Sequence, residues 1–171
     1  IGLPPQRCLV RPLYALALLV GLLSPVPAMA QTQIDIVEEI DCLALNIYHE
    51  ARGEPDIGKI AVGFVVLNRV ADDRFPETVC EVVRQGGEQT LHRCQFSWWC
   101  DGLSDKPRDD RSWQKIQTVA RTVYWGFSLD PTAGALWYHA DSVLPYWGKV
   151  LDRGPKIGQH VFYVDEPYMR S

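Results

Sequence analysis

Apolar residues in the first half of the chain recur at the spacing of amphipathic helices. From Ile40 to Ala51 they fall three and four positions apart, which predicts a helix over residues 36–52 with one buried face. A second helix is predicted over residues 55–70, with Pro55 suited to an early helical position. Because this second segment is apolar nearly all round, we expect it to lie in the centre of the fold.

The middle of the chain mixes helical and irregular patterns. A short helix is predicted over residues 78–85, after an aromatic–proline break. Residues 86–109 are rich in glycine, aromatic and charged residues, which indicates irregular structure. A fourth helix is predicted over residues 112–127, with an apolar stripe on one face and Asp110 or Ser112 as its N-cap.

The C-terminal part carries short strand patterns instead of helical spacing. Residues 135–140 and 161–164 have the apolar and aromatic composition of strands. Residues 149–151 form a third candidate strand, closed by a turn over residues 152–155 that contains Gly and Pro. A helical body followed by a small sheet is an α+β fold.

Residues 1–30 have the form of a secretory signal. Two arginines precede an apolar run over residues 13–23, and Ala28-Met29-Ala30 has the small-x-small form of a cleavage site. The run is too short for a permanent membrane span. We therefore expect export to the periplasm or cell exterior, cleavage before Gln31, and a single domain over residues 31–171. An uncleaved N-terminal anchor is the alternative.

The net charge of the chain bears on the kind of molecule that it binds. Two of the 17 Lys and Arg residues lie in the predicted signal and none of the 21 acidic residues does, so removing the signal lowers the formal charge from −4 to −6. An acidic exported domain argues against a nucleic-acid partner. No later segment is long and apolar enough to span a membrane, so we expect contact with a membrane only during export. We also expect a monomer.

Four cysteines remain after the predicted signal: Cys42, Cys80, Cys94 and Cys100. In an exported domain they predict two disulfides, with three possible pairings. Cys94 and Cys100 flank a short loop, and pairing them leaves Cys42 and Cys80 to join the first helix to the third, which is the arrangement we favour. A zinc site is the alternative, but the chain has no Cys-x-x-Cys pair.

Glu50 is the strongest candidate for acid–base chemistry. It follows Ile47 by three residues, so its side chain points to the apolar face of the first predicted helix, in the last turn before Gly53 and Pro55 end that helix. Partial burial and the negative end of the helix dipole both raise the pKa of a carboxyl group there, as a proton donor near neutral pH requires. A buried ion pair with Arg69 is the structural alternative.

Two further carboxylates could act with Glu50. Glu54 lies four residues later, where the chain is turning. It could be a second catalytic carboxylate, a residue that orients the loop or an exposed surface residue, and we favour the orienting role. Asp141 follows the candidate strand at residues 135–140. The spacing selects neither as a catalytic partner.

An aromatic cluster inside the predicted short disulfide loop could bind sugar rings. Gln95, Phe96 and Ser97 precede Trp98 and Trp99 there. The apolar face of a pyranose stacks on aromatic rings while its hydroxyls take hydrogen bonds from amide and hydroxyl groups. The alternative is that these aromatic residues fill the core under the loop.

A second aromatic cluster combines Tyr138 and His139 with Trp147. Alternation along a strand would put Tyr138 and His139 on opposite sides. His139 could also join His49 and His160 as metal ligands, but the chain has no His-Glu-x-x-His spacing. We expect no metal and no cofactor.

Several ordered blocks resemble the SleB-type cell wall hydrolases, the spore-cortex-lytic family. The resemblance covers about residues 40–164. The matching blocks are His49 to Pro55, Gly58, residues 61–70, Phe75-Pro76, Gln95-Phe96-Ser97, Tyr138-His139-Ala140, Trp147 and the run from Ile157 to Tyr163. His49 stands where the family commonly has glycine.

The resemblance implies a lysozyme-like fold, close to lytic transglycosylases and resuscitation-promoting factors. It implies a catalytic domain over residues 31–171 that cleaves peptidoglycan glycan strands between N-acetylmuramic acid (MurNAc) and N-acetylglucosamine (GlcNAc), with Glu50 as the catalytic acid. The residues that we expect to bind substrate are Glu54, Gln95, Phe96, Ser97, Tyr138, His139, Trp147 and Tyr163.

A single well-placed glutamate favours a lytic transglycosylase over a hydrolase that needs two carboxylates. In that reaction the acid protonates the leaving oxygen and then, as a carboxylate, accepts the proton of the sugar's own 6-hydroxyl. Two alternatives belong to other classes. One is a non-catalytic peptidoglycan-binding envelope domain, and the other is a metal-dependent amidase or peptidase that uses His49, His139 and His160.

Overall fold

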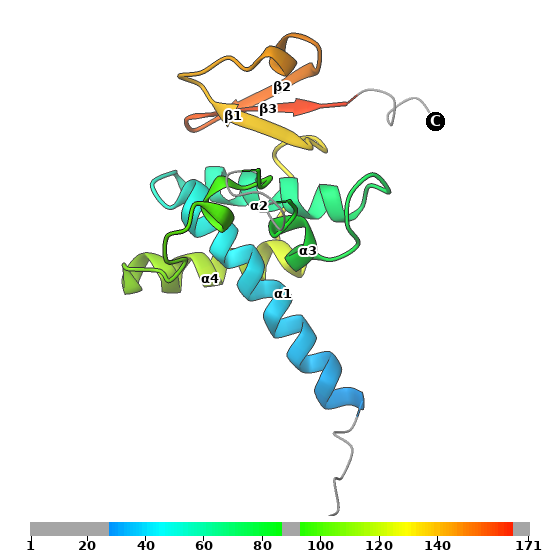
Figure 1. The fold of residues 1–171 in the computed structure, drawn as a ribbon, viewed down its shortest axis with the longest axis vertical. Coiled ribbons are helices and arrows are strands. Elements are labelled where there is room, and N and C mark those ends of the chain that lie inside the picture. The colour runs from blue at the N-terminus through cyan, green and yellow to red at the C-terminus, as the bar shows by residue number, and fades with distance from the viewer. Residues whose placement is uncertain (1–27, 87–92, 166–171) are drawn as a thin grey trace, which may run out of the picture.

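A body of helices carries a small sheet on one side (Figure 1). The computed structural model describes residues 28–86 and 93–165, with side chains from Asp35 onward. The elements are α1 (Ala28–Ala51), α2 (Asp56–Val70), α3 (Val79–Val83), the 3₁₀ helix η1 (Ser97–Cys100), α4 (Asp110–Tyr124), β1 (Trp137–Ala140), the 3₁₀ helix η2 (Tyr146–Lys149), β2 (Asp152–Ile157) and β3 (His160–Val164). The predicted α+β class is confirmed. Among the described helices, none is both long and apolar enough to cross a membrane.

Helix α1 is the scaffold of the helical body. Its apolar face is completely buried at Leu43, Ala44 and Ile47, and it packs against α2, α3 and α4. The helix predicted over residues 36–52 is therefore present, although it begins earlier than predicted. The predicted signal lies mostly outside the described residues, and its cleavage remains a prediction.

Helix α2 occupies the centre of the body, as its apolar sequence predicts. Ala61, Val62, Val65 and Val66 are all fully buried. Gly63 allows close approach of its neighbours, since a Cβ there would lie 3.1 Å from an Ile47 side-chain carbon on α1 and 3.3 Å from a Val123 side-chain carbon on α4. The centre of the core is thus the meeting point of these three helices.

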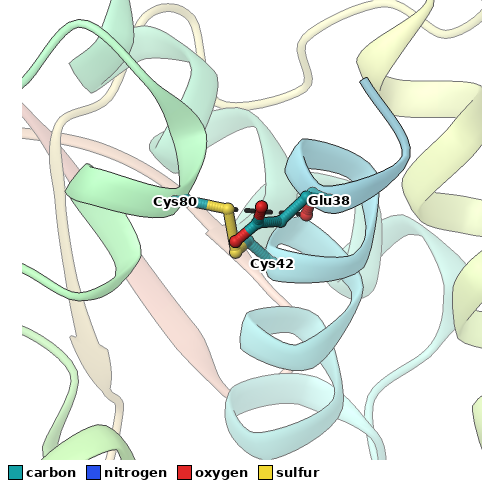
Figure 2. Close-up of side chains that lie close together, drawn as sticks. All are labelled: Glu38, Cys42 and Cys80. Carbon is teal, nitrogen blue, oxygen red and sulfur yellow. Dashed lines mark hydrogen bonds between the residues drawn. A yellow bond between two sulfur atoms is a disulfide. The ribbon is translucent and has the colours of Figure 1, made fainter. Parts of the chain in front are cut away.

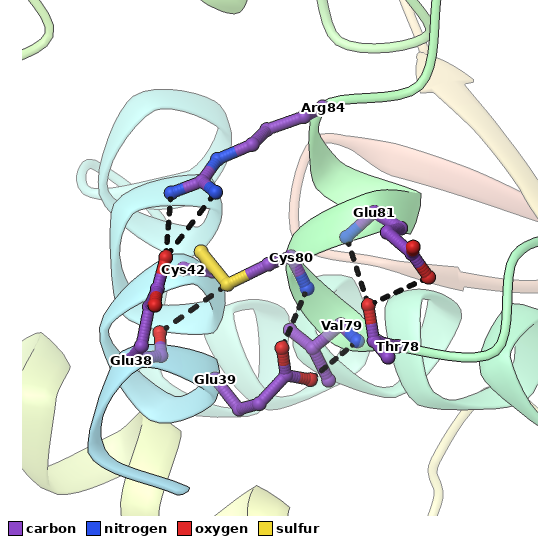
Figure 3. The surroundings of a disulfide bond; sticks show 8 residues. All are labelled: Glu38, Glu39, Cys42, Thr78, Val79, Cys80, Glu81 and Arg84. Carbon is purple, nitrogen blue, oxygen red and sulfur yellow. Dashed lines mark hydrogen bonds and ion pairs between the residues drawn. A yellow bond between two sulfur atoms is a disulfide. The ribbon is translucent and has the colours of Figure 1, made fainter. Parts of the chain in front are cut away.

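The predicted disulfide between Cys42 and Cys80 ties α1 to α3 (Figure 2). Glu39, one turn earlier in α1, accepts hydrogen bonds from the backbone N–H groups of Val79 (2.6 Å) and Cys80 (3.3 Å), as Figure 3 shows. A carboxylate at this helix start satisfies two donors that the helix leaves unpaired. A covalent link and a charged hydrogen-bond pair therefore hold the same junction.

The N-caps of α3 and α4 are Thr78 and Asp109. The Thr78 hydroxyl accepts a hydrogen bond from the N–H of Glu81 (3.2 Å), and the Asp109 carboxylate accepts one from the N–H of Ser112 (3.1 Å). The predicted cap of α4, Asp110 or Ser112, was wrong. A capping side chain reaches the N–H three residues ahead, so Ser112 supplies the donor and Asp109 the acceptor.

The three strands pair antiparallel in the order β1-β3-β2. β1 and β3 lie where strands were predicted, but the strand predicted over residues 149–151 was wrong, and the segment predicted as a turn belongs to β2. β2 is an edge strand, where Pro155 needs no partner for its missing N–H. The pairing register shifts between Arg153 and Lys156, so Gly154 and Pro155 lie at an irregularity that a sheet edge accommodates.

Candidate active site

Glu50 lies half-buried in the last turn of α1, in the lining of an open pocket of about 400 Å³. The helix ends here because the chain turns: the N–H of Glu54 bonds to the carbonyl of Ala51 (2.9 Å), and Pro55 then leads into α2. The lining residues are His49, Glu50, Ala51, Arg52, Gly53, Glu54, Ala140, Gln159 and His160. The pocket therefore lies between the end of α1 and one end of the sheet.

Tyr138, on β1, donates a hydrogen bond from its hydroxyl to Oε2 of Glu50 (3.1 Å). Burial raises the pKa of Glu50, and the Tyr138 bond and the positive charge of Arg69 offset that rise only in part. Burial and the neighbouring carboxylate raise the pKa of Tyr138 well above its ordinary value, so the phenol retains its proton. The direction of the Glu50 shift agrees with the expectation from the sequence.

Arg69, on α2, is the positive charge that acts on Glu50. It is only 2 % exposed, and its Nε donates a hydrogen bond to the carbonyl of Leu136 (2.8 Å). Its guanidinium lies 5.3 to 5.4 Å from the centroids of three rings: Phe75, Phe96 and Trp137. Burial lowers the pKa of Arg69 to about 10, so it stays charged at neutral pH. In the part of the chain that the structure describes, no ion pair joins Arg69 to Glu50, so the carboxylate is not locked in the buried pair that was the structural alternative.

Three of the predicted binding residues come from the segment that leads into η1, and their environments differ. Gln95 is exposed and, with its amide oxygen turned toward Arg69, accepts hydrogen bonds from both terminal guanidinium nitrogens (3.2 and 3.1 Å). Phe96 is buried and belongs to the core, which was the alternative for this cluster. Ser97 is exposed at the start of η1.

The second predicted disulfide, between Cys94 and Cys100, closes the loop that carries Trp98. The indole of Trp98 stacks on the His49 ring, with 4.4 Å between centroids and 11° between planes. Its N–H donates a hydrogen bond to Oδ1 of Asn46 on α1 (3.2 Å). His49, which precedes Glu50, is therefore packed against a loop that a disulfide closes.

Glu54 is 9 % exposed and directs its carboxylate to the turn between β2 and β3. Its Oε2 accepts a hydrogen bond from the N–H of Gln159 (3.0 Å), and its backbone carbonyl accepts one from Nζ of Lys59. Gly158 has a φ of +60°, and a Cβ there would lie 1.8 Å from the Glu54 carboxylate. This geometry is that of a residue that orients a loop.

Strand alternation separates Tyr138 from the other predicted aromatic residues. Neighbours along β1 face opposite sides of the sheet, which puts Tyr138 on the side of Glu50 and His139 on the other side. The ring of His139 shares a hydrogen bond with the hydroxyl of Tyr163 (2.9 Å), and Trp147 packs against both rings, with centroids 5.6 and 5.5 Å away. These three residues form a cluster outside the lining of the Glu50 pocket, and their role in binding remains a prediction.

His160, at the start of β3, lines the Glu50 pocket, and the sequence suggested it only as a metal ligand or as part of the last matching block. It is 9 % exposed, and its Nδ1 has no hydrogen-bond partner among the described residues. Its ring meets the Tyr138 ring edge-on at 5.2 Å. Because burial lowers the pKa of His160, the imidazole is neutral at neutral pH, and its unpaired Nδ1 is buried behind the pocket lining.

The candidate metal ligands do not gather at the pocket. One group within the described residues is close enough to share an ion: Glu38, Cys42 and Cys80 (Figure 2). Its two sulfurs are bonded to each other, so neither is the thiolate that a metal requires. In the same described ranges, His49, His139 and His160 belong to no such group.

Comparison with known proteins identifies the family. The family model described as Cell Wall Hydrolase matches residues 53–163. The chain belongs to the cell wall hydrolase family. The matched region begins at Gly53, three residues after Glu50.

Curated relatives of this chain include the spore cortex-lytic enzymes of two bacteria. The enzyme of Bacillus cereus is 30 % identical over 125 residues, and the enzyme of Halalkalibacterium halodurans is 30 % identical over 126 residues. Each match covers 72 % of this chain but only 43 % and 34 % of the respective relative. The chain therefore spans less than half the length of these relatives.

Two solved structures resemble this chain. The catalytic domain of the germination-specific lytic transglycosylase SleB from Bacillus anthracis matches with a TM-score of 0.57 and 31 % identity, over 74 % of this chain and 93 % of that one. The catalytic domain of the Bacillus cereus SleB protein matches with a TM-score of 0.56 and 29 % identity, over 75 % and 91 %. These matches confirm the family resemblance and the lysozyme-like fold expected from the sequence.

Proposed function

We propose that this protein cleaves the glycan strands of peptidoglycan between MurNAc and GlcNAc, as a lytic transglycosylase with Glu50 as general acid and base. One observation carries the proposal: the Glu50 carboxyl is half-buried, raised in pKa and open to a pocket, with Tyr138 bonded to one oxygen. Similarity to spore cortex-lytic enzymes and to a lytic transglycosylase catalytic domain supports the same reaction.

Glu50 donates a proton in the first step and accepts one in the second. The protonated carboxyl gives its proton to the glycosidic oxygen, the bond from that oxygen to the MurNAc anomeric carbon breaks, and GlcNAc leaves with a free hydroxyl. The carboxylate then takes the proton of the MurNAc 6-hydroxyl, whose oxygen bonds to the anomeric carbon and closes an anhydro ring. Glu50 is protonated again and no water is consumed. Tyr138 holds one carboxyl oxygen and leaves the other for substrate, while Arg69 stabilises the transient negative charge.

The environments of Glu54 and Asp141 favour ring closure by the sugar's own hydroxyl over attack by water. A two-carboxylate glycosidase needs a second carboxyl group free to act across the bond. Glu54 is buried and bonded to the N–H of Gln159. Asp141 is exposed and forms an ion pair with Lys156 (2.6 Å). Both carboxylates thus have structural partners, which leaves closure by the sugar's own hydroxyl as the chemistry that Glu50 supports best.

Mass spectrometry of fragments released from purified sacculi tests the proposal. We expect muramic ends that carry the anhydro ring and are lighter by one water than hydrolysed ends. Hydrated muramic ends would instead indicate a muramidase with a second carboxylate or a positioned water. Retention on sacculi without release of any fragment would indicate a non-catalytic binding domain, and release of stem peptides would indicate an amidase or peptidase.

We further propose that residues 1–30 direct export, with cleavage before Gln31, and that residues 31–171 act as a monomer in the periplasm or outside the cell at the cell wall. Two disulfides support an exported domain, because disulfides persist in oxidising compartments. N-terminal sequencing of the exported protein should begin at Gln31, and light scattering should give the monomer mass. Retention of residues 1–30 on a membrane-bound product would favour an uncleaved anchor.

A further inference from the structure

A second pocket, of about 390 Å³, adjoins the Glu50 pocket and shares His49 and Arg52 with it. It lies against α1 and the segment that joins η1 to α4. Its lining also includes Tyr48, Asp101, Asp105, Lys106, Arg108 and Asp109. The proposed glycan cleavage assigns no role to this pocket.

The wall of this second pocket is held onto α1 by hydrogen bonds. The hydroxyl of Tyr48, itself buried, accepts hydrogen bonds from the backbone N–H groups of Arg108 (2.9 Å) and Asp109 (3.1 Å). The ring of His49 donates through Nε2 to the carbonyl of Asp105 (3.0 Å). Residues 105–109 are thus anchored next to the candidate acid before any ligand arrives, which lowers the entropic penalty of binding.

The pocket presents charged groups of both signs. In the described ranges, no ion pair joins Arg52, Lys106 or Arg108 to a carboxylate. Two of the three acidic residues are engaged locally: Asp109 caps α4, and Asp101 accepts a hydrogen bond from the N–H of Leu103 (2.7 Å). Three cations without an ion-pair partner among the described residues therefore line the pocket beside three carboxylates, of which Asp101 and Asp109 are held by hydrogen bonds and keep their negative charge.

We propose that this pocket binds the stem peptide of the MurNAc residue whose bond is cleaved, an inference that rests on the proposed function. MurNAc carries the peptide on its lactyl group, and its anomeric carbon reacts beside Glu50, so the peptide leaves the first pocket close to the acid. Stem-peptide carboxylates match Lys106 and Arg108, and a free amino group matches Asp105. The enzyme then prefers peptide-bearing strands over bare glycan.

Cleavage rates on two forms of the same glycan test this inference. Soluble strands with intact stem peptides are compared with strands from which an amidase has removed the peptides, and kcat/KM is measured from anhydro ends. We expect the natural protein to prefer the peptide-bearing strands by about five- to tenfold. That preference should shrink as ionic strength rises, since exposed charges are screened by salt.

Variants separate the peptide pocket from the glycan site. The double substitution Lys106→Ala with Arg108→Ala should abolish the preference and leave cleavage of bare glycan unchanged. Arg121→Ala, which removes an exposed charge at the far end of α4, is the matched control and should keep the preference. Equal losses on both strands, or no preference in the natural protein, would overturn the peptide pocket alone. Failure to cleave either strand would overturn the proposed function, and this inference with it.

Discussion

The hydroxyl of Tyr138 and the carboxyl of Glu50, 88 positions apart in the chain, meet in a hydrogen bond of 3.1 Å. Tyr138 belongs to the sheet and Glu50 to the end of α1, so the acid is oriented only when the sheet packs on the helical body. The bond also stabilises the charged form of Glu50 and opposes the effect of burial on its pKa. One contact therefore links the assembly of the fold to the titration of the group that we propose as the acid.

Tyr138→Phe should change the pH dependence of cleavage. Glu50 must be protonated at the start of the reaction, so the alkaline limb of kcat/KM reports its pKa in the free enzyme. Removing the hydroxyl removes an interaction that lowers this pKa, so the alkaline limb should move to higher pH. The maximal rate should also fall about tenfold, because one carboxyl oxygen of Glu50 loses its hydrogen bond. Tyr146→Phe, at a side chain that is 84 % exposed, is the control. A limb that stays in place or moves to lower pH would contradict the assignment.

Glu54→Gln and Glu54→Ala should give different results. The amide oxygen of Gln can still accept the hydrogen bond from the N–H of Gln159, so this variant should keep at least about a third of the activity. Alanine leaves that N–H without its partner and should lower the unfolding free energy by about 1 to 3 kcal/mol. Lysis assays and urea denaturation measure the two effects. If Glu54→Gln lost as much activity as a Glu50 variant, Glu54 would be a second catalytic carboxylate.

Gly158→Ala should destabilise the protein more than Gly102→Ala does. Both glycines have positive φ values, +60° and +79°, so both substitutions strain the backbone by about 1 to 2 kcal/mol. A Cβ on Gly158 would also collide with the Glu54 carboxylate, whereas nothing lies within 4 Å of a Cβ on Gly102. Urea denaturation should show the extra penalty, and adding Glu54→Ala to Gly158→Ala should remove most of it. Equal penalties at the two glycines would show that the Glu54 contact does not constrain this turn.

The two disulfides should contribute differently to stability and activity. Replacing Cys42 and Cys80 by Ala opens a link across 38 residues and should lower the unfolding free energy by about 4 kcal/mol, with activity kept at low temperature. Replacing Cys94 and Cys100 by Ala opens a link across six residues and should lower the unfolding free energy by about 2 kcal/mol. This variant should also lose activity, because the loop carries Trp98, which stacks on His49. Urea denaturation and lysis assays distinguish these effects. Full activity in the second variant would show that the loop does not position the site.

Local patterns were sufficient to predict the part of the site that depends on one helix. The spacing around Ile47 places Glu50 on the buried face of the last turn, and burial raises its pKa in the structure as expected. The pairing of four cysteines also followed from which helices and loops they flank. The position of Glu50 and the Cys94–Cys100 loop depend on residues close in the sequence, and pairing Cys94 with Cys100 left Cys42 and Cys80 for each other.

The features that the sequence did not predict depend on contacts between distant elements. β2 contains Gly154 and Pro155, which look like a turn unless the strand is known to lie at the sheet edge. Alternation places Tyr138 and His139 on opposite faces, but only the packing of the sheet decides which face meets Glu50. The unpaired Nδ1 of His160 likewise arises from tertiary burial and has no signal in the surrounding residues.

The most direct test replaces Glu50 by Gln and measures the release of anhydro fragments from purified peptidoglycan. We expect a loss of at least about 100-fold, because the amide neither donates nor accepts the transferred proton. The variant should remain folded: the raised pKa means that the fold disfavours the charged carboxylate, so at neutral pH the unfolding free energy should be equal to or above that of the natural protein. Near-normal fragment release by the folded variant would contradict the assignment of Glu50 as the acid.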